Sequence, residues 1–408
     1  MKTRLRNFLI GLVGAVIIAL GLSILTATTA ATSFSYTVTD LGSLGGSSSV
    51  AYGINDAGQV VGYAYRDRGI EHAFLWEKGT MQDLGTLSSS DEWAYSEAWG
   101  INNKGQVVGY AYSDRGYKHA FLWENGKMRD LDPFFSDDSY ANAINDKGQV
   151  VGWLYSSGCY IVRSRAFLWE NGKMRDLDFL NGNLSYARAI NDKGQIVGTV
   201  VPIHNGSYDY QAFLGTNGKM INLTLNGGLS FAWDINNKEQ VVGDTPIYKS
   251  AVNFDTHAAL WTNGKIRDLG TLGGRDSFAN AINNRGQVVG HANLKSDSSD
   301  THAVLGTINS IRSLDTFNPE CETADGINKR EQVAESVSES FPPLSAEYSH
   351  AFVWVNGMIR DLNSLIPANS GWQLTEARDI NNKGQIVGYG ELKGQTHAFL
   401  LTPTWVTR

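Results

Sequence analysis

Six histidines stand at equivalent points of the chain, and their ring nitrogens are the groups best suited to hold a metal ion. Zinc binds imidazole at about 2 Å, so several of these side chains would have to meet at one point. Each lies on its own strand in a separate segment, and packed sheets are about 10 Å apart. We therefore predict no metal and no cofactor. The histidines, with Arg165 and Gln211 at the two remaining equivalent points, are His72, His119, His257, His302, His350 and His397.

A structural role for these histidines is predicted by their distance from an aspartate. A tight turn at Lys78-Gly79 would place Phe74 opposite Asp83 in a hairpin, with His72 diagonally across from that carboxylate. A hydrogen bond is within reach in this arrangement, and we expect one in each segment. The two examples that define the prediction are His72 with Asp83 and His119 with Asp130.

The segments that carry these residues are copies of one repeat. In every copy an asparagine follows isoleucine, with alanine four residues before it and glutamine four residues after it. We predict turn and packing roles for these asparagines, Asn55 and Asn102 among them. The eight asparagines, spaced 43 to 53 residues apart, are Asn55, Asn102, Asn145, Asn191, Asn236, Asn283, Asn328 and Asn381.

Each copy predicts four short strands. The first, such as SVAYGIN (49–55), ends in a turn that asparagine opens and glycine closes, and QVVGYAY follows. After a variable loop, HAFLWE and KMRDL are joined by a tight turn such as Asn125-Gly126, a strong hairpin signal. A four-stranded unit of about 45 residues has the size of a propeller blade. The tryptophans expected to pack between blades are Trp76, Trp123, Trp169, Trp261 and Trp354.

The two ends of the repeat region complete each other. The last copy stops at HAFLL (397–401) without a fourth strand, while SYTVTDLG (35–42) is a fourth strand without the first three. Pairing of these strands would close a ring and protect the sheet edges. We predict an all-β fold, an eight-bladed β-propeller of four-stranded blades over residues 32–403, with residues 404–408 as a tail.

The recurring run HAFLW, followed by G-x-M-x-D-L and preceded by INNKGQVVG, resembles the HAF-type repeats of extracellular bacterial proteins. The resemblance extends over about residues 35–401. It implies export and a repeat fold. It brings no catalytic residue and no activity to this chain.

Positions at which the copies differ are the candidates for binding. One lies three residues before the asparagine on the first strand, which is usually the innermost strand of a blade. Aromatic faces with polar groups between them suit a sugar or a polar peptide at the channel mouth. The alternative is that these side chains fill the channel wall, with Asp325 and Arg378 as an ion pair. The eight residues are Tyr52, Trp99, Asn142, Arg188, Trp233, Asn280, Asp325 and Arg378.

The longer loops are predicted to emerge on one face of the ring, because the strands alternate in direction. Variable loops on a rigid scaffold commonly carry binding. Cys159 and Cys321 fall on this face in nearly opposite blades, so we predict two free thiols. The aromatic side chains expected to be exposed on these loops are Trp93, Phe134, Phe135 and Trp372.

Residues 1–31 have the order of a secretory signal. Lys2, Arg4 and Arg6 precede an apolar run at 8–25, and the small residues TATTAATS follow. The run is also near the shortest length for a membrane span, so an uncleaved anchor is the alternative, with 8–25 as the membrane contact. Both interpretations predict export of the rest of the chain, to the periplasm or the cell exterior.

Without the three basic residues of that segment, the chain has 31 basic and 41 acidic residues and a net charge of −10. Nucleic acid binding requires clustered positive charge, so it is not expected.

Three functions remain open. The first is non-catalytic binding of a glycan, a peptide or a surface protein by a monomer, because no G-x-S-x-G or H-E-x-x-H motif is present. The second is a polysaccharide lyase or hydrolase that uses Asp325 with Arg188 or Arg378, or the pair Asp137 and Asp138. The third is a structural role in assembly at the cell surface.

Overall fold

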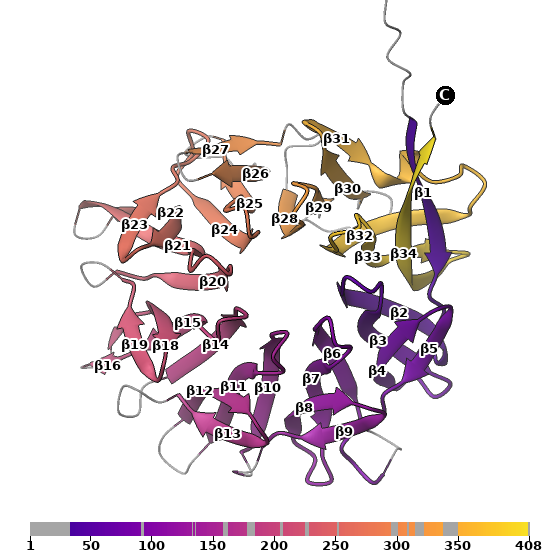
Figure 1. Ribbon diagram of the computed structural model, residues 1–408, viewed down its shortest axis with the longest axis horizontal. Helices are drawn as coiled ribbons and strands as arrows, with labels where there is room; N and C mark the ends of the chain where they lie inside the picture. Colours follow the sequence, from indigo (N-terminus) through magenta and orange to yellow (C-terminus); the bar gives the residue numbers. More distant parts are fainter. Residues whose placement is uncertain are drawn as a thin grey trace, which may run out of the picture. The chain divides into compact units, whose positions relative to one another are not determined.

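The computed structural model describes residues 33–90, 94–132, 134, 136–157, 162–177, 184–204, 207–224, 228–250, 253–294, 301–307, 310–314, 322–337 and 350–406. Residues 36–403 form one compact unit. This unit is a ring of eight four-stranded antiparallel sheets that follow one another in chain order, so the predicted eight-bladed propeller is confirmed (Figure 1).

The first strand of each blade lies nearest the ring axis and the fourth lies outermost (Figure 1). The strands of blades one to four are β2 (Gly45–Ile54), β3 (Val60–Arg66), β4 (Glu71–Glu77) and β5 (Thr80–Asp83); β6 (Ser96–Ile101), β7 (Val107–Tyr112), β8 (Lys118–Glu124) and β9 (Lys127–Asp130); β10 (Asp138–Ile144), β11 (Val150–Ser157), β12 (Val162–Glu170) and β13 (Lys173–Asp176); and β14 (Leu184–Ile190), β15 (Ile196–Val201), β18 (Gln211–Thr216) and β19 (Lys219–Asn222). Blade four also carries the small hairpin of β16 (Ile203–His204) and β17 (Ser207–Tyr208).

Blades five to seven repeat this order, and blade eight takes its outermost strand from the start of the propeller sequence. The strands are β20 (Phe231–Ile235), β21 (Val241–Ser250), β22 (Asn253–Thr262) and β23 (Lys265–Asp268); β24 (Ser277–Ile282), β25 (Val288–Asn293), β26 (Thr301–Thr307) and β27 (Ser310–Ser313); β28 (Glu322–Ile327), β29 (Val333–Val337), β30 (His350–Val355) and β31 (Met358–Asp361); and β32 (Trp372–Ile380), β33 (Ile386–Leu392), β34 (Gln395–Val406) and β1 (Ser33–Asp40). A short 3₁₀ helix, η2 (Leu362–Ser364), follows β31.

The pairing of β1 with β34 closes the ring as predicted. Within the propeller, the backbone N–H of Leu41 donates to Ala398 O at 3.0 Å, and His397 contacts Asp40 at 2.9 Å. Outside this unit, Ser35 Oγ and Thr404 Oγ1 are 2.7 Å apart.

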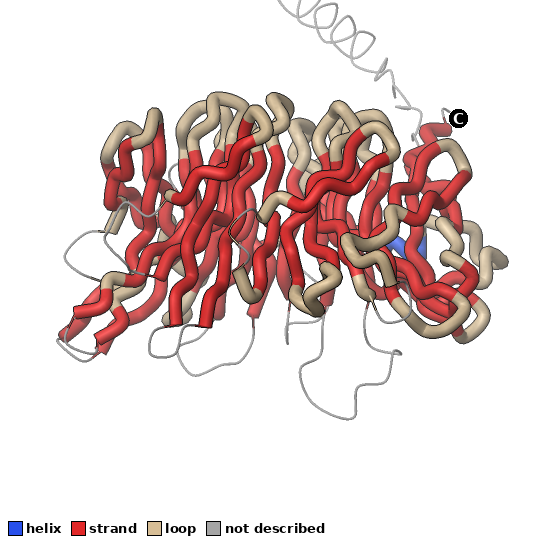
Figure 2. The backbone as a smooth tube through the Cα atoms, turned by 90° about the horizontal axis from the view of Figure 1, so that it is seen from below, coloured by secondary structure: helices blue, strands red, loops and turns tan. Residues whose placement is uncertain are grey.

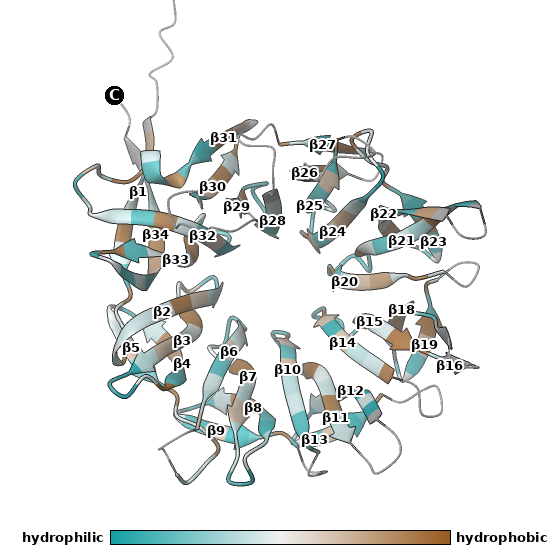
Figure 3. Cartoon of the chain, turned by 180° about the vertical axis from the view of Figure 1, so that it is seen from behind, coloured by the Kyte–Doolittle hydropathy of each residue, from teal (hydrophilic) through white to brown (hydrophobic). Residues whose placement is uncertain are grey.

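The apolar core is divided into layers between adjacent blades. Val61 and Leu75 of blade one pack with Ala98, Val107 and Trp123 of blade two. Similar apolar clusters lie at six other interfaces of the described residues, and four of these also contain a tryptophan. All five predicted tryptophans occupy such layers and are at most 8% exposed. Middle strands such as β4 and β15 are buried along most of their length, whereas buried and partly exposed residues alternate on innermost strands such as β10; Figure 3 shows the distribution of apolar and polar residues over the blades.

The tight turns also match their sequence signals. Asn125 and Gly126 have φ values of 52° and 79°, the left-handed pair that a two-residue hairpin requires. Strands run through the thickness of the ring, so that turns and loops lie at its two ends (Figure 2).

The repeated asparagines, here called the asparagine ring, join the first hairpins of all eight blades. Asn55 Nδ2 donates to Asn102 O at 3.0 Å, and the equivalent bond recurs from blade to blade until Asn381 donates to Asn55 O at 3.0 Å. Within each turn the side-chain oxygen accepts two backbone N–H groups, for Asn55 those of Ala57 and Gln59. One side chain thus shapes its own turn and binds the next blade.

Candidate functional site

The eight variable residues of the innermost strands all occupy the same irregularity, a β-bulge. In blade one, Ala51 pairs with Gly62 and Gly53 pairs with Val61, so that Tyr52 between them is an extra residue. The same shift recurs in every other blade. A bulge redirects the side chain of the extra residue. Here the alanine before it is fully buried, whereas the eight bulge residues remain partly or fully exposed.

Each bulge residue has two variable neighbours in its blade. One stands two residues earlier on the first strand, and the other lies opposite that residue on the second strand, as Glu97 and Tyr110 do beside Trp99. Trp99 Nε1 donates to Glu97 at 3.0 Å, and the Tyr110 hydroxyl donates to the other oxygen of the same carboxylate. Burial and this hydrogen bond hold the pKa of Tyr110 far above its ordinary value, so the hydroxyl remains a donor.

Aromatic side chains from three consecutive blades meet at these positions and form what we call the aromatic platform. Trp99 and Tyr140 are stacked within 3° of parallel with centroids 5.8 Å apart, and Tyr140 is stacked on Trp153 at 4.6 Å. Trp153 contacts Tyr186 edge-on at 5.4 Å. The platform comprises Trp99, Tyr110, Tyr140, Trp153 and Tyr186, all half-buried except Tyr110, which is buried.

Charged groups border the platform. Lys118 Nζ lies 4.7 Å from the centroid of the Tyr110 ring and 5.9 Å from that of Tyr140. Asp138 accepts a hydrogen bond from the Lys118 backbone at 2.9 Å. Burial raises the pKa of Glu71, and the nearby charge of Glu97 raises it further. The border therefore offers both a cation and carboxylates to a polar ligand.

Three other bulge residues, Asn142, Arg188 and Asn280, each contact a residue of the next blade. Arg188 lies 4.8 Å above the ring of Trp233, and Asn142 Nδ2 donates to Ala187 O at 2.7 Å. Asn280 Nδ2 donates to Asp325 at 3.4 Å. These contacts join adjacent blades, whereas Arg188 and Asp325 lie on blades four and seven and do not come together.

The ion pair considered as the alternative, Asp325 with Arg378, is not a direct contact among the described residues, although the charge of Arg378 acts on Asp325. Arg378 instead binds Glu376 of its own strand at 2.6 Å, because a residue two positions away on the same face is nearer than the next blade. Arg378 also lies 5.8 Å from the ring of Tyr52. Burial raises the pKa of Asp325, although the charge of Arg378 opposes this.

Asp137 and Asp138, the other acidic pair considered, serve the local backbone. Asp137 accepts hydrogen bonds at 2.5 Å from both the backbone and the hydroxyl of Ser157, which keeps its pKa below the ordinary value. The lowered pKa of Asp137 favours the ionised form, which does not suit a general acid.

Five of the six histidines form the expected contact with aspartate, whereas the residue equivalent to that aspartate for His302 is Ser313. Phe74 pairs with Asp83, and His72 Nδ1 lies 2.9 Å from that carboxylate. Burial alone would raise the pKa of Asp83, but the bonds from His72 and from the Gly85 backbone bring it below the ordinary value. Equivalent contacts at 2.8 to 3.1 Å join His119, His257, His350 and His397 to Asp130, Asp268, Asp361 and Asp40. Among the residues described, no three metal-binding side chains gather at one point.

A hollow of about 340 Å³ lies at the end of the channel where the first hairpins turn. The asparagine ring and the residues beside it, including Asp146, Asp192 and Lys329, line this hollow. Because the ring asparagines are buried and already bonded to one another, they offer few free groups to a ligand.

Of the aromatic residues predicted on loops, Phe134 is 49% exposed and Trp372 is half-buried against Phe399. Trp93, Phe135, Cys159 and Cys321 lie outside the described residues. None of the helices in the described part of the chain has the length and apolar character needed to traverse a bilayer.

Sequence reasoning found Trp99 but missed its platform partners Tyr110, Tyr140, Trp153 and Tyr186. For Tyr110 and Trp153 the available signal was a second variable position on the second strand, which follows a glycine in seven of the eight copies. There the copies carry Tyr63, Tyr110, Trp153, Thr199, Asp244, His291, Ser336 and Tyr389.

Comparisons with known proteins agree with the architecture. A family of unknown function, DUF3466, matches residues 37–136 and, in an overlapping match, residues 81–185. No curated protein matches the chain. The fold and the repeats therefore define an eight-bladed propeller with similarity to DUF3466 in its first part.

Several solved structures are similar in fold. A prolyl endopeptidase covers 80% of this chain at 10% identity and a TM-score of 0.53, with 49% of its own chain covered. An acylaminoacyl peptidase from Pyrococcus horikoshii shares 11% identity over 84% of this chain, with a TM-score of 0.49, and the match spans 57% of its length. The propeller domain of the Trilobed protease from Pyrococcus furiosus has 10% identity, a TM-score of 0.44 and coverage of 77% and 94%. At such identities the likeness shows the propeller fold alone.

Proposed function

We propose that this protein is an exported, non-catalytic β-propeller that binds a glycan through the aromatic platform. The observation that carries the proposal is the run of stacked, half-buried rings across blades two to four, bordered by Lys118, Glu97 and Asp138. Flat aromatic faces receive the apolar faces of sugar rings, and the polar border supplies hydrogen bonds to hydroxyl groups.

Export and the HAF-type repeat family are part of this proposal. The basic, apolar and small residues at 1–31 support secretion to the periplasm or cell exterior. The proposed form of the exported protein is a monomer. Intact-mass measurement of the exported protein should show loss of this segment, and retention would favour an anchored form.

The test is affinity electrophoresis of the purified protein through gels that contain different polysaccharides. We expect one or more of them to retard the wild type. Trp99→Ala and Tyr140→Ala should each weaken binding by about tenfold, because each removes a stacking surface. Phe134→Ala is the matched control, since it removes an exposed aromatic ring whose neighbour is Arg165, a residue outside the platform.

Retardation that both platform variants retain in full would contradict the proposal, provided that their melting temperatures show that they are folded. The same mixtures, incubated and then analysed for chain length, test the lyase or hydrolase alternative. Shortened polysaccharide would overturn the non-catalytic assignment.

A further inference from the structure

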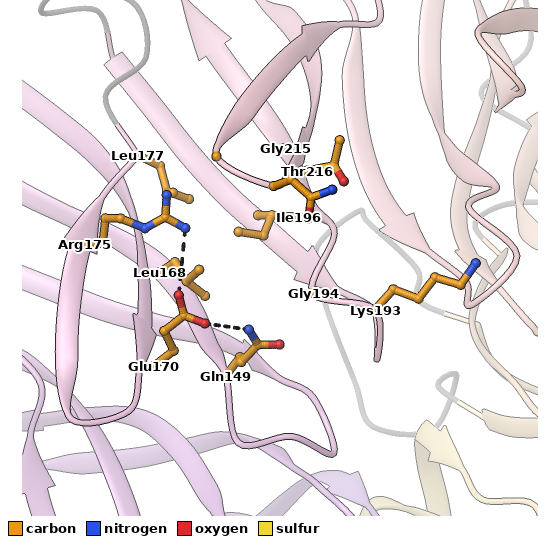
Figure 4. A pocket seen from close by; sticks show the side chains of 12 residues that line it. Gln149, Leu168, Glu170, Arg175, Leu177, Lys193, Gly194, Ile196, Gly215 and Thr216 are labelled. Carbon is orange, nitrogen blue, oxygen red and sulfur yellow. Dashed lines mark hydrogen bonds and ion pairs between the residues drawn. The ribbon is translucent and has the colours of Figure 1, made fainter.

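Five of the eight blades carry a tryptophan on the third strand that packs into the interface with the preceding blade, and blade four does not. Trp261 on β22 packs against blade four, and four other blades carry a tryptophan at the same position. In blade four this position is Gly215, which pairs with Met220 as Trp261 pairs with Ile266. A cavity of about 300 Å³ lies there, between blades three and four (Figure 4).

The cavity has an apolar base and a polar edge. Leu168, Leu177 and Ile196 form the base, and each is at most 3% exposed. At the edge, Glu170 accepts a hydrogen bond from Gln149 at 2.7 Å and lies 4.0 Å from Arg175, as Figure 4 shows. A concave site with an apolar base and a few fixed polar groups is typical of small-molecule binding.

The repeat itself shows which group fits this space. Around Trp261 the wall consists of Leu214, Leu223 and Val241, which are the repeat equivalents of Leu168, Leu177 and Ile196. Trp261 Nε1 donates to the Leu223 carbonyl at 2.8 Å. The equivalent acceptor in the cavity is the carbonyl of Leu177. The walls are thus those that elsewhere enclose an indole ring and accept its N–H group.

The space at Gly215 is open. A Cβ atom there would meet nothing closer than 3.7 Å, from Ile196. Blade six also has a glycine at this position, Gly306, but Ile311 Cγ2 would lie 3.1 Å from its Cβ and therefore occupies the vacancy. A glycine at this position is therefore not sufficient for a cavity. In blade four the cavity exists because no neighbouring side chain covers the apolar base.

We propose that this cavity binds the indole ring of a ligand, either a free indole compound or the tryptophan side chain of a peptide. The ring would rest on Leu168 and Ile196 and donate its N–H group to Leu177 O. The site lies at the outer part of the interface, separate from the aromatic platform, so it adds a second ligand to the proposed glycan.

Isothermal titration calorimetry with indole tests the proposal. We expect one site per chain with a dissociation constant below about 1 mM, within the limit for so small a ligand. Indole should also raise the melting temperature by roughly 1–4 °C at saturating concentration. 1-Methylindole, which lacks the N–H donor, should bind at least about fivefold more weakly.

Two variants make the test specific to this cavity. Gly215→Trp supplies the ring covalently and should abolish the titration while raising the melting temperature. Gly215→Met, a flexible side chain that fits irregular spaces, serves the same purpose if the tryptophan variant does not fold. N-acetyltryptophanamide distinguishes the sources: binding equal to that of indole assigns the site to a peptide tryptophan, and weaker binding assigns it to a free indole compound.

Absence of an indole titration in the folded wild type would overturn the proposal. So would an unchanged titration in a folded Gly215 variant. Neither result depends on glycan binding, which Trp99→Ala tests separately.

Discussion

Two aspartates near the channel, the buried Asp244 and the partly exposed Asp379, have pKa values well above that of an ordinary aspartate. Asp244 is 4% exposed and accepts a hydrogen bond from Trp233 Nε1 at 2.5 Å, and burial raises its pKa to about 6. Burial likewise raises the pKa of Asp379 to about 6, although the backbone N–H groups of Ile54 and Ile380 donate to it. Both carboxylates therefore change charge near neutral pH.

Asp244 should make stability depend on pH in a defined direction. Its pKa is higher in the folded protein than the ordinary 3.8, so its contribution is fully present below pH 3.8 and is lost as pH rises through 6. Asp244→Asn keeps the acceptor for Trp233 and removes the buried charge. At pH 7.5 the variant should be more stable than the wild type by roughly 1–3 kcal/mol, and the difference should vanish at pH 4.

Urea unfolding followed by tryptophan fluorescence at several pH values measures this difference. Asp137→Asn is the control, because its exposed carboxylate has a lowered pKa and should not show the same trend. A stability gap for Asp244→Asn that is independent of pH would contradict the assignment.

The β-bulge is the feature of the strands that most affects the candidate site. Gly62 lies where a Cβ atom would come within 1.9 Å of Val50 O, because the bulge brings the first strand close to the second. The equivalent residue is glycine in every blade except the seventh, where Glu335 stands fully buried. The structure offers no evident reason for that exception.

Gly62→Ala should therefore destabilise the protein by more than about 3 kcal/mol, since backbone rather than a flexible side chain opposes the added carbon. Gly215→Ala is the matched control on a strand where the added carbon has room. It should be neutral or stabilise by up to about 1 kcal/mol. Chemical denaturation of both variants measures the change in the free energy of unfolding. A small change for Gly62→Ala would contradict the prediction and would show that the bulge can rearrange.

The strands, the turns and the register of the outer hairpins could be predicted from sequence, because Asn-Gly turns and alternating residues act locally. The bulge could also have been detected. Ala51 and Ile54 both pack in the core although three residues separate them, whereas a regular strand would place them on opposite faces. The contacts of Trp99 with Tyr140 could not be foreseen, since they depend on the distance between blades.

At the scale of the whole molecule, stability depends on closing the ring with a strand from the other end of the sequence. β1 covers the edge of β34, where an exposed row of backbone groups would otherwise invite pairing with another chain. The contact of Asp40 with His397 lies at this junction.

Deletion of residues 1–40 should lower the melting temperature and cause association through β34. Size-exclusion chromatography combined with thermal unfolding measures both effects. A synthetic peptide of residues 33–42 should restore the monomer and part of the stability by strand addition, and a scrambled peptide should not. A truncated protein that remains monomeric and equally stable would show that β1 is dispensable for closure.

The asparagine ring has an electrical consequence. Its eight side-chain amides all point from one blade toward the next, so their dipoles follow one another head to tail around the circle. Dipoles arranged head to tail around a closed ring cancel one another, so the net dipole of the eight amides is close to zero. The field at that end therefore comes from the side chains of the turns, in which acidic residues such as Asp146 and Asp192 are followed directly by basic ones, Lys147 and Lys193. An ion that approaches this mouth therefore meets the charges of the turn side chains and almost no net field from the amides beneath them.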